Sequence, residues 1–184
     1  MKPAGPLMIE HRLIERMIHL MERHVVAMEK GGRVDERFLD TAVDFIRTYA
    51  DRCHHGKEED ILFRDLAKKP LSDAHRRQMA DLVEEHVYAR KTVGLMLAAE
   101  ARCLRGDREA FAQVLACIRE LLVFYPGHIR KEDREFFPAA MGYLDASEQA
   151  AMLEEFREFD RLLIHGHYQQ VVGDLEAAEG EAPG

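Results

Sequence analysis

The sequence predicts an all-α fold, an up-down-up-down four-helix bundle with an additional C-terminal helix. Apolar residues recur at helical spacing along nearly the whole chain, and strand-like alternation of apolar and polar residues is absent. Glycine and proline, the residues that interrupt helices, number only 12 and 6 in 184 residues. We expect residues 1–184 to form a single domain, because this length is typical of one hydrophobic core.

Four long helices with short connections make up the predicted bundle, residues 7–144. Gly31-Gly32, Pro70 and Gly106 supply the expected helix ends, and Ser72 or Asp73 can cap the third helix. Pro126 is expected to kink the fourth helix, because it lacks the N–H that an interior turn needs. The predicted helices run from about Leu7 to Lys30, from Asp35 to Lys69, from Ser72 to Arg105 and from Asp107 to Leu144.

A fifth helix is predicted over residues 147–178, after the bundle. It begins near Ser147 and is expected to pack outside the bundle or across one of its ends. The tail, residues 179–184, is expected to fray.

Composition excludes several classes of partner. With 26 basic and 34 acidic residues the net charge is −8, which argues against nucleic acid and anionic membranes as partners. No stretch of about 20 uninterrupted apolar residues predicts a membrane span. Cys53, Cys103 and Cys117 are widely spaced, so we expect neither a disulfide framework nor a thiolate zinc site, and a cytoplasmic location. The oligomeric state stays open.

An internal repeat links the predicted helices. The segment from His54 to Phe63 corresponds to the segment from His128 to Phe137, 74 positions later, with histidine, lysine, glutamate and phenylalanine in common. The Glu-His pair that ends at His11 likewise recurs at His86. The chain therefore resembles a duplicated helix pair, and the repeat is stronger evidence for a functional site than any single histidine.

The repeated residues have the chemistry of metal ligands. Residues four apart share one face of a helix, so His54 with Glu58 and His128 with Glu132 form imidazole–carboxylate pairs on otherwise apolar faces. Burying such groups without partners costs several kcal/mol each, and about two metal ions would remove that cost. Iron, manganese and zinc suit these ligands. The alternative is a salt-bridged bundle interior without metal.

The segments EHRLIERM, CHHGKEEDILF, EEHVYAR and HIRKEDREFFP resemble the hemerythrin-like, HHE cation-binding domains. The resemblance covers about Leu7 to Met141 and implies a four-helix bundle with two iron ions per chain, bridged by carboxylates and by an oxo or hydroxo group. Manganese or zinc would be less typical. The residues that match the family's ligand positions are His11, His54, Glu58, His86, His128 and Glu132.

The resemblance leaves some ligands open. In oxygen-carrying members the last carboxylate lies five residues after its histidine, which points to Asp133, with Glu59 in the equivalent place; the repeat favours Glu132. Those members also bring a second histidine from the third helix, which this chain lacks. A fifth nitrogen from His165 or His167, or a phenolate from Tyr168, could replace it. We expect His55, about 100° around the helix from His54, to lie beside the site or at the surface.

Spacing argues against a ferritin-like carboxylate centre, which needs Glu-x-x-His on two helices. The residues three positions before His54 and His128 are Asp51 and Tyr125, so the pattern fails on one side, at Tyr125. We expect a non-haem di-iron protein that binds, senses or processes oxygen, nitric oxide or peroxide. Whether it is an enzyme stays open, and a weak peroxidase or catalase-like activity is compatible with the site. The alternative is a metal-stabilised regulatory or interaction bundle without turnover.

Overall fold

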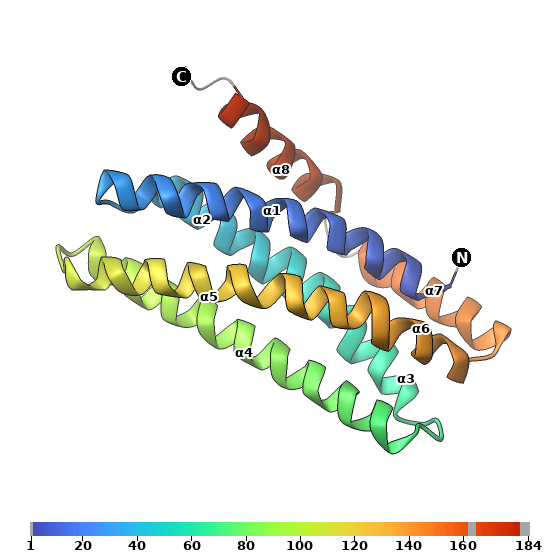
Figure 1. Ribbon diagram of the computed structural model, residues 1–184. Helices are drawn as coiled ribbons and strands as arrows, with labels where there is room; N and C mark the ends of the chain where they lie inside the picture. Colours follow the sequence, from blue (N-terminus) through green and yellow to red (C-terminus); the bar gives the residue numbers. More distant parts are fainter. Residues whose placement is uncertain (1, 162–164, 181–184) are drawn as a thin grey trace.

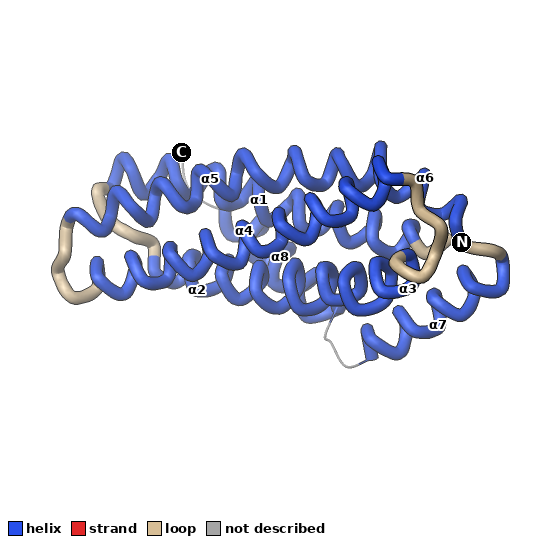
Figure 2. The backbone as a smooth tube through the Cα atoms, turned by 90° about the horizontal axis from the view of Figure 1, so that it is seen from below, coloured by secondary structure: helices blue, strands red, loops and turns tan. Residues whose placement is uncertain are grey.

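The computed structural model describes residues 2–161 and 165–180, and every regular element in that part of the chain is a helix. The all-helical prediction is confirmed. Four long helical stretches lie lengthwise beside one another (Figure 1), as the view from below also shows (Figure 2). They are α1 (Ala4–Gly31); α2 (Glu36–Phe45) with η1 (Ile46–His55), η2 (Glu58–Phe63) and α3 (Arg64–Leu66); α4 (Asp73–Cys103); and α5 (Glu109–Lys131) with η3 (Glu132–Phe136), α6 (Phe137–Ala140) and η4 (Met141–Tyr143).

The helix ends follow the predicted signals. Asp35 caps α2 by accepting a hydrogen bond from the backbone N–H of Phe38, and Ser72 caps α4 in the same way. Gly32 and Gly106 adopt left-handed φ values of 63° and 91° at the turns after α1 and α4, a conformation that glycine adopts without strain. Local chemistry thus sets the lengths of the long helices.

Three segments depart from the α-helical geometry that the sequence predicted. η1, η2 and η3 are π-helical, with backbone hydrogen bonds that close a wider turn than those of an α-helix. They fall in the second and fourth stretches, at the histidines and glutamates of the repeat. In these three segments the set of side chains that faces the interior therefore differs from the set that an α-helix would bury.

The predicted single helix over residues 147–178 is wrong, because the structure has two helices, α7 (Ala146–Arg161) and α8 (His165–Gly180). α7 contacts η2, whereas α8 contacts α1 and runs at an angle to it (Figure 1). The physical reason is that they bury apolar residues in different parts of the core: Phe156 of α7 joins one cluster and Val172 of α8 another. Residues 179–180 of the predicted tail belong to α8, and residues 181–184 lie outside the described part of the chain.

The core consists of two apolar clusters with a polar layer between them. On α1, Leu7 belongs to one cluster and Ile14 to the other, and His11 lies between them. On the fourth stretch, Tyr125 and Phe136 belong to different clusters in the same manner. Each long stretch therefore delivers its repeat residues to the middle of the molecule.

One stretch, Glu109–Tyr143, is long and apolar enough to cross a membrane by length and composition alone, a test that core helices of soluble proteins also pass. Here it contains the buried His128 and Glu132, and α5 lies against α1 and α4. Packing in the bundle core accounts for its apolar character.

Candidate metal centre

The six side chains that match the family's ligand positions converge in the polar layer, and each has an exposed fraction of 3% or less. The polar layer contains two groups of side chains, and within each group the donor atoms lie within 4.8 Å of one another. The first group unites three of the four long stretches, and the second also unites three. The first contains His11, His54, Glu58 and Glu132, and the second contains His55, His86 and His128.

Glu58 and Glu132 lie at the centre, each close to imidazoles of both groups. Two donors bound to one ion at about 2.0–2.2 Å lie roughly 3.0–3.5 Å apart. The separations between Nε2 and carboxylate oxygen are close to that range. They are 3.2 Å for His11–Glu132, 3.3 Å for His86–Glu58, 3.4 Å for His128–Glu132, 3.5 Å for His54–Glu58 and 3.7 Å for His86–Glu132.

These inward-facing atoms lack hydrogen-bond partners among the described residues. Buried polar atoms are nearly always hydrogen-bonded, because leaving one unpaired costs about 1–3 kcal/mol. A set of orphaned imidazole nitrogens and carboxylate oxygens at ligand spacing therefore fits metal ions such as iron, manganese or zinc. The orphaned atoms are Nε2 of His11, His54, His86 and His128, and both carboxylate oxygens of Glu58 and Glu132.

The opposite ring nitrogen of each of these histidines contacts an outer carboxylate. Metal-bound histidines are typically held in this way, which fixes the ring orientation and directs Nε2 at the metal. The four contacts form two pairs at equivalent positions of the repeat, so the carboxylates that hold the rings recur together with the histidines. The Nδ1–oxygen distances are 2.7 Å for His11–Asp133, 2.9 Å for His54–Glu10, 2.7 Å for His86–Glu59 and 2.7 Å for His128–Glu85.

Cations stabilise the outer carboxylates in turn. Lys57 contacts Glu10, and Lys131 contacts Glu85 at the corresponding place in the repeat. Sequence reasoning noticed that these residues recur but assigned them no role. The recurrence was the available signal, since a residue that only supports a ligand still has to repeat with it.

The charges in the cluster shift the pKa values of its members. Burial lowers the pKa of His11, but the carboxylates of Asp133 and Glu132 outweigh it and raise the pKa to about 10. The pKa of His86 rises to about 11, against the effect of burial, because carboxylates surround it. Burial raises the pKa of Glu132, yet His128 and its other imidazole neighbours hold it well below its usual value. Metal binding must therefore displace protons from imidazoles.

His55 lies beside the predicted ligands, one of the two places that the sequence left open for it. The other place, the surface, is excluded, because His55 is 1% exposed and its ring stacks on His86 with centroids 3.8 Å apart. Because η1 is π-helical, successive side chains are separated by less than 100°, so His54 and His55 both face the interior. Burial holds the pKa of His55 well below its ordinary value, and the neutral ring is the form that binds metals.

Comparison with protein families agrees with the geometry that the chain contains a cation-binding domain. A family model described as the hemerythrin HHE cation binding domain matches residues 5–140, most of the chain. The chain belongs to this hemerythrin family. Comparisons with curated proteins and with solved structures give no significant match. The His/Glu cluster of this hemerythrin domain can hold metal ions.

Two of the further candidate ligands lie around the hemerythrin-type cluster rather than in it. The carboxylate of Asp133 contacts Nδ1 of His11 and the guanidinium of Arg12. Glu59 contacts Nδ1 of His86 in the equivalent way. Each contacts the outer nitrogen of an imidazole, whereas the residue before it, Glu58 or Glu132, lies against Nε2 atoms in the middle of the cluster.

The candidates on the C-terminal helix do not join the cluster. His167 is exposed and its ring lies against Tyr168. The Tyr168 hydroxyl donates a hydrogen bond of 2.8 Å to Asp44, away from the histidine–glutamate layer. The side chain of His165 lies outside the described residues. Helix α8 therefore brings neither an imidazole nor a phenolate to the cluster from its described side chains, and His55 is the candidate fifth imidazole.

Proposed function

We propose that the chain is an up-down-up-down four-helix bundle that holds two metal ions, iron by preference, in the buried histidine–glutamate cluster. The observation that carries this proposal is the set of buried Nε2 and carboxylate oxygen atoms without hydrogen-bond partners among the described residues. Two ions give all of these atoms a role as ligands, and the outer carboxylates already hold the rings as ligated histidines are held. Membership in the hemerythrin family favours iron over manganese or zinc.

The donors divide unevenly between two ions. One group has three imidazoles, from His55, His86 and His128, and the other has two, from His11 and His54. The central glutamates have oxygens near both groups, so the ions would share them. An ion with two imidazoles has one protein ligand fewer, which supports binding of an external ligand. We infer that this ligand is small, such as oxygen, nitric oxide or peroxide.

The chain's own residues would hold and shield such a centre. Bound iron would supply the redox chemistry, including any weak peroxidase or catalase-like activity. The four outer carboxylates orient the imidazoles, and the near-complete burial of the cluster keeps bulk water away from it. The three cysteines form no disulfide, and one of them is partly exposed, which supports a reducing, cytoplasmic setting.

Metal analysis tests the proposal directly. Protein purified without added metal is expected to carry about two iron ions per chain, with two peaks in an anomalous-scattering map at the iron edge. His86→Ala should lose iron, whereas His19→Ala, at a side chain that is 69% exposed, should keep it. Less than about one iron per chain in the wild type, without iron charge-transfer absorption, would refute the proposal.

The complete burial of the cluster also favours a second candidate of another class. In this case the ions join the helices of a regulatory or interaction module, and no external ligand binds. Azide binding and peroxide consumption distinguish the two. A spectral change with azide supports the first function, and inertness at full iron content supports the second. If the site is saturated, His55→Ala should create azide binding that the wild type lacks.

A further inference from the structure

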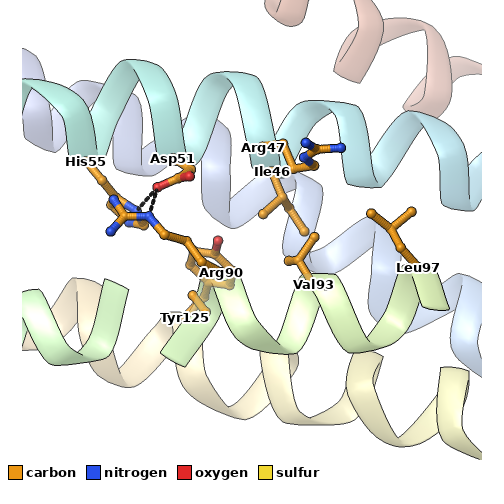
Figure 3. Close-up of a pocket in the computed structure, with 10 residues that line it drawn as sticks. Ile46, Arg47, Asp51, His55, Arg90, Val93, Leu97 and Tyr125 are labelled. Atoms are coloured by element: carbon orange, nitrogen blue, oxygen red, sulfur yellow. Dashed lines mark hydrogen bonds and ion pairs between the residues drawn. The ribbon is translucent and has the colours of Figure 1, made fainter. Parts of the chain in front are cut away.

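A cavity of about 350 Å³ lies between η1 and α4, next to the metal cluster. It has two chemically different ends, as Figure 3 shows. At one end the wall is aliphatic, and at the other end polar side chains meet. The aliphatic end has Ile46, Val93 and Leu97, with the side chain of Arg47 beside Ile46, and the polar end has Asp51, His55, Arg90 and Tyr125.

The hydroxyl of Tyr125 has no hydrogen-bond partner among the described residues, although the side chain is only 1% exposed. Figure 3 shows this side chain rising from α5 with its hydroxyl toward the helix that carries Asp51 and His55. A buried hydroxyl without a partner costs about 1–3 kcal/mol, so its retention at a cavity wall points to a ligand that accepts its hydrogen bond.

The charged groups at the same end are already engaged with each other. Nε of Arg90 lies 2.7 Å from a carboxylate oxygen of Asp51, and its Nη2 lies 2.7 Å from Glu59. Because the guanidinium of Arg90 lies between two carboxylates, the polar end has no unpaired cation among its described side chains to attract an anion; the other lining guanidinium, that of Arg47, lies beside Ile46 at the opposite end. The polar end therefore favours a neutral head group.

The size of the cavity argues for more than a diatomic molecule. A water molecule takes about 30 Å³ in the liquid, so about 350 Å³ is several times what oxygen or nitric oxide would need. Sites for small organic molecules begin at about 300 Å³ and are mostly apolar with a few placed polar groups. The aliphatic wall and the single free hydroxyl among the described lining residues match that pattern.

We propose that this cavity binds a short aliphatic molecule with a neutral oxygen head group, such as an alcohol, carbonyl compound or hydroperoxide. The head accepts a hydrogen bond from Tyr125, and the hydrocarbon chain lies along Ile46, Val93 and Leu97. His55 lines the cavity and also belongs to the cluster, so an occupant sits beside the metal; this last point rests on the proposed function.

Binding of 1-hexanol to the purified protein, followed by ligand-observed NMR, tests the proposal. Gly94 lines the cavity, and a Cβ atom there would meet no atom within 4 Å, so we expect the larger side chain of Gly94→Leu to occupy part of the cavity. We expect it to weaken 1-hexanol binding at least about tenfold, the equivalent of about two buried methylene groups. Gly173→Leu, equally free of contacts but on α8, is the matched control and should bind as the wild type does.

Tyr125→Phe separates a ligand-binding role from a structural one. It should weaken 1-hexanol binding roughly 2- to 12-fold, the effect of one hydrogen bond, while the melting temperature stays equal or rises. A structural hydroxyl would behave in the opposite way, with lower thermal stability and unchanged binding.

Three results would overturn the proposal: no 1-hexanol binding by the wild type, equal binding by Gly94→Leu, or a Tyr125→Phe variant that is less stable yet binds normally. Hexanoate that binds more tightly than 1-hexanol would refute the neutral head group. Iron content is measured on the same samples, so failure of the cavity proposal with iron retained leaves the proposed metal centre standing. Hexanol binding without iron would refute the metal centre alone.

Discussion

The buried ion pair of Lys57 and Glu10 is predicted to stabilise the fold far more than its counterpart in the repeat. Lys57 is 0% exposed, contacts Glu10 and lies 2.7 Å from Asp160. Glu10 in turn lies 2.9 Å from Nδ1 of His54. Lys57→Met removes the cation and leaves a buried carboxylate next to a candidate ligand.

The magnitude follows from burial. Removing one partner of a buried pair costs about 3–5 kcal/mol, which for a chain of this length lowers the melting temperature by about 6–20 °C. Lys131 and Glu85 occupy the corresponding positions, but their side chains are 31% and 27% exposed. Lys131→Met should therefore cost about 0–1 kcal/mol, or at most about 4 °C.

Thermal and urea denaturation of the two variants, with the same metal content as the wild type, measures the difference. Because the pairs are equivalent in sequence, only their surroundings can make the results differ: Asp160 and the ring of Phe156, both from α7, cover Lys57. Equal losses of stability in Lys57→Met and Lys131→Met would refute this reasoning, as would a Lys57→Met variant as stable as the wild type.

Three further predictions concern the cluster. His167→Ala should leave iron content and azide affinity unchanged in absorption titrations, because this side chain is exposed; loss of iron would contradict its placement. Glu59→Gln should lower metal affinity about 10- to 100-fold in competition with a chelator, since it supports His86, whereas the exposed Glu135→Gln should not. In the metal-free protein the pKa values of His11 and His86 are raised to about 10 and 11, so both imidazoles are protonated near pH 8. Metal binding at this pH should therefore release about two protons, and the apparent metal affinity should rise with pH. Titration calorimetry in which the heat of metal binding does not depend on the buffer would refute this prediction.

The parts of the site that could be predicted are those that depend on residue type and spacing. His54 and Glu58 face the same way because four residues make nearly one helical turn, and the recurrence at His128 and Glu132 marks the same chemistry twice. The helix ends were equally local, since glycine and a capping serine act within a few residues. Local rules therefore suffice for the helices and for the six residues that match the family's ligand positions.

What could not be predicted depends on contacts between elements or on departures from ideal geometry. The complete burial of His55 could not be predicted from α-helical angles, because η1 is π-helical. The split of the C-terminal segment into α7 and α8 reflects two separate apolar surfaces, which no periodicity reveals. The contact of Lys57 with Asp160 joins residues 103 positions apart.

In the proposed metal centre, the departure from the repeat at His55 makes the two halves unequal. In the aligned segments His55 corresponds to Ile129, so a strict duplication would give two imidazoles to each half. The histidine adds a third nitrogen to one half, and the cavity with Tyr125 opens beside that same residue. The other half keeps two imidazoles, and its His54 is supported by the ion pair that α7 covers. With metal bound as proposed, a duplicated scaffold would thus carry an asymmetric centre, in which each side has distinct candidate ligands and surroundings and could take a different role toward an external ligand.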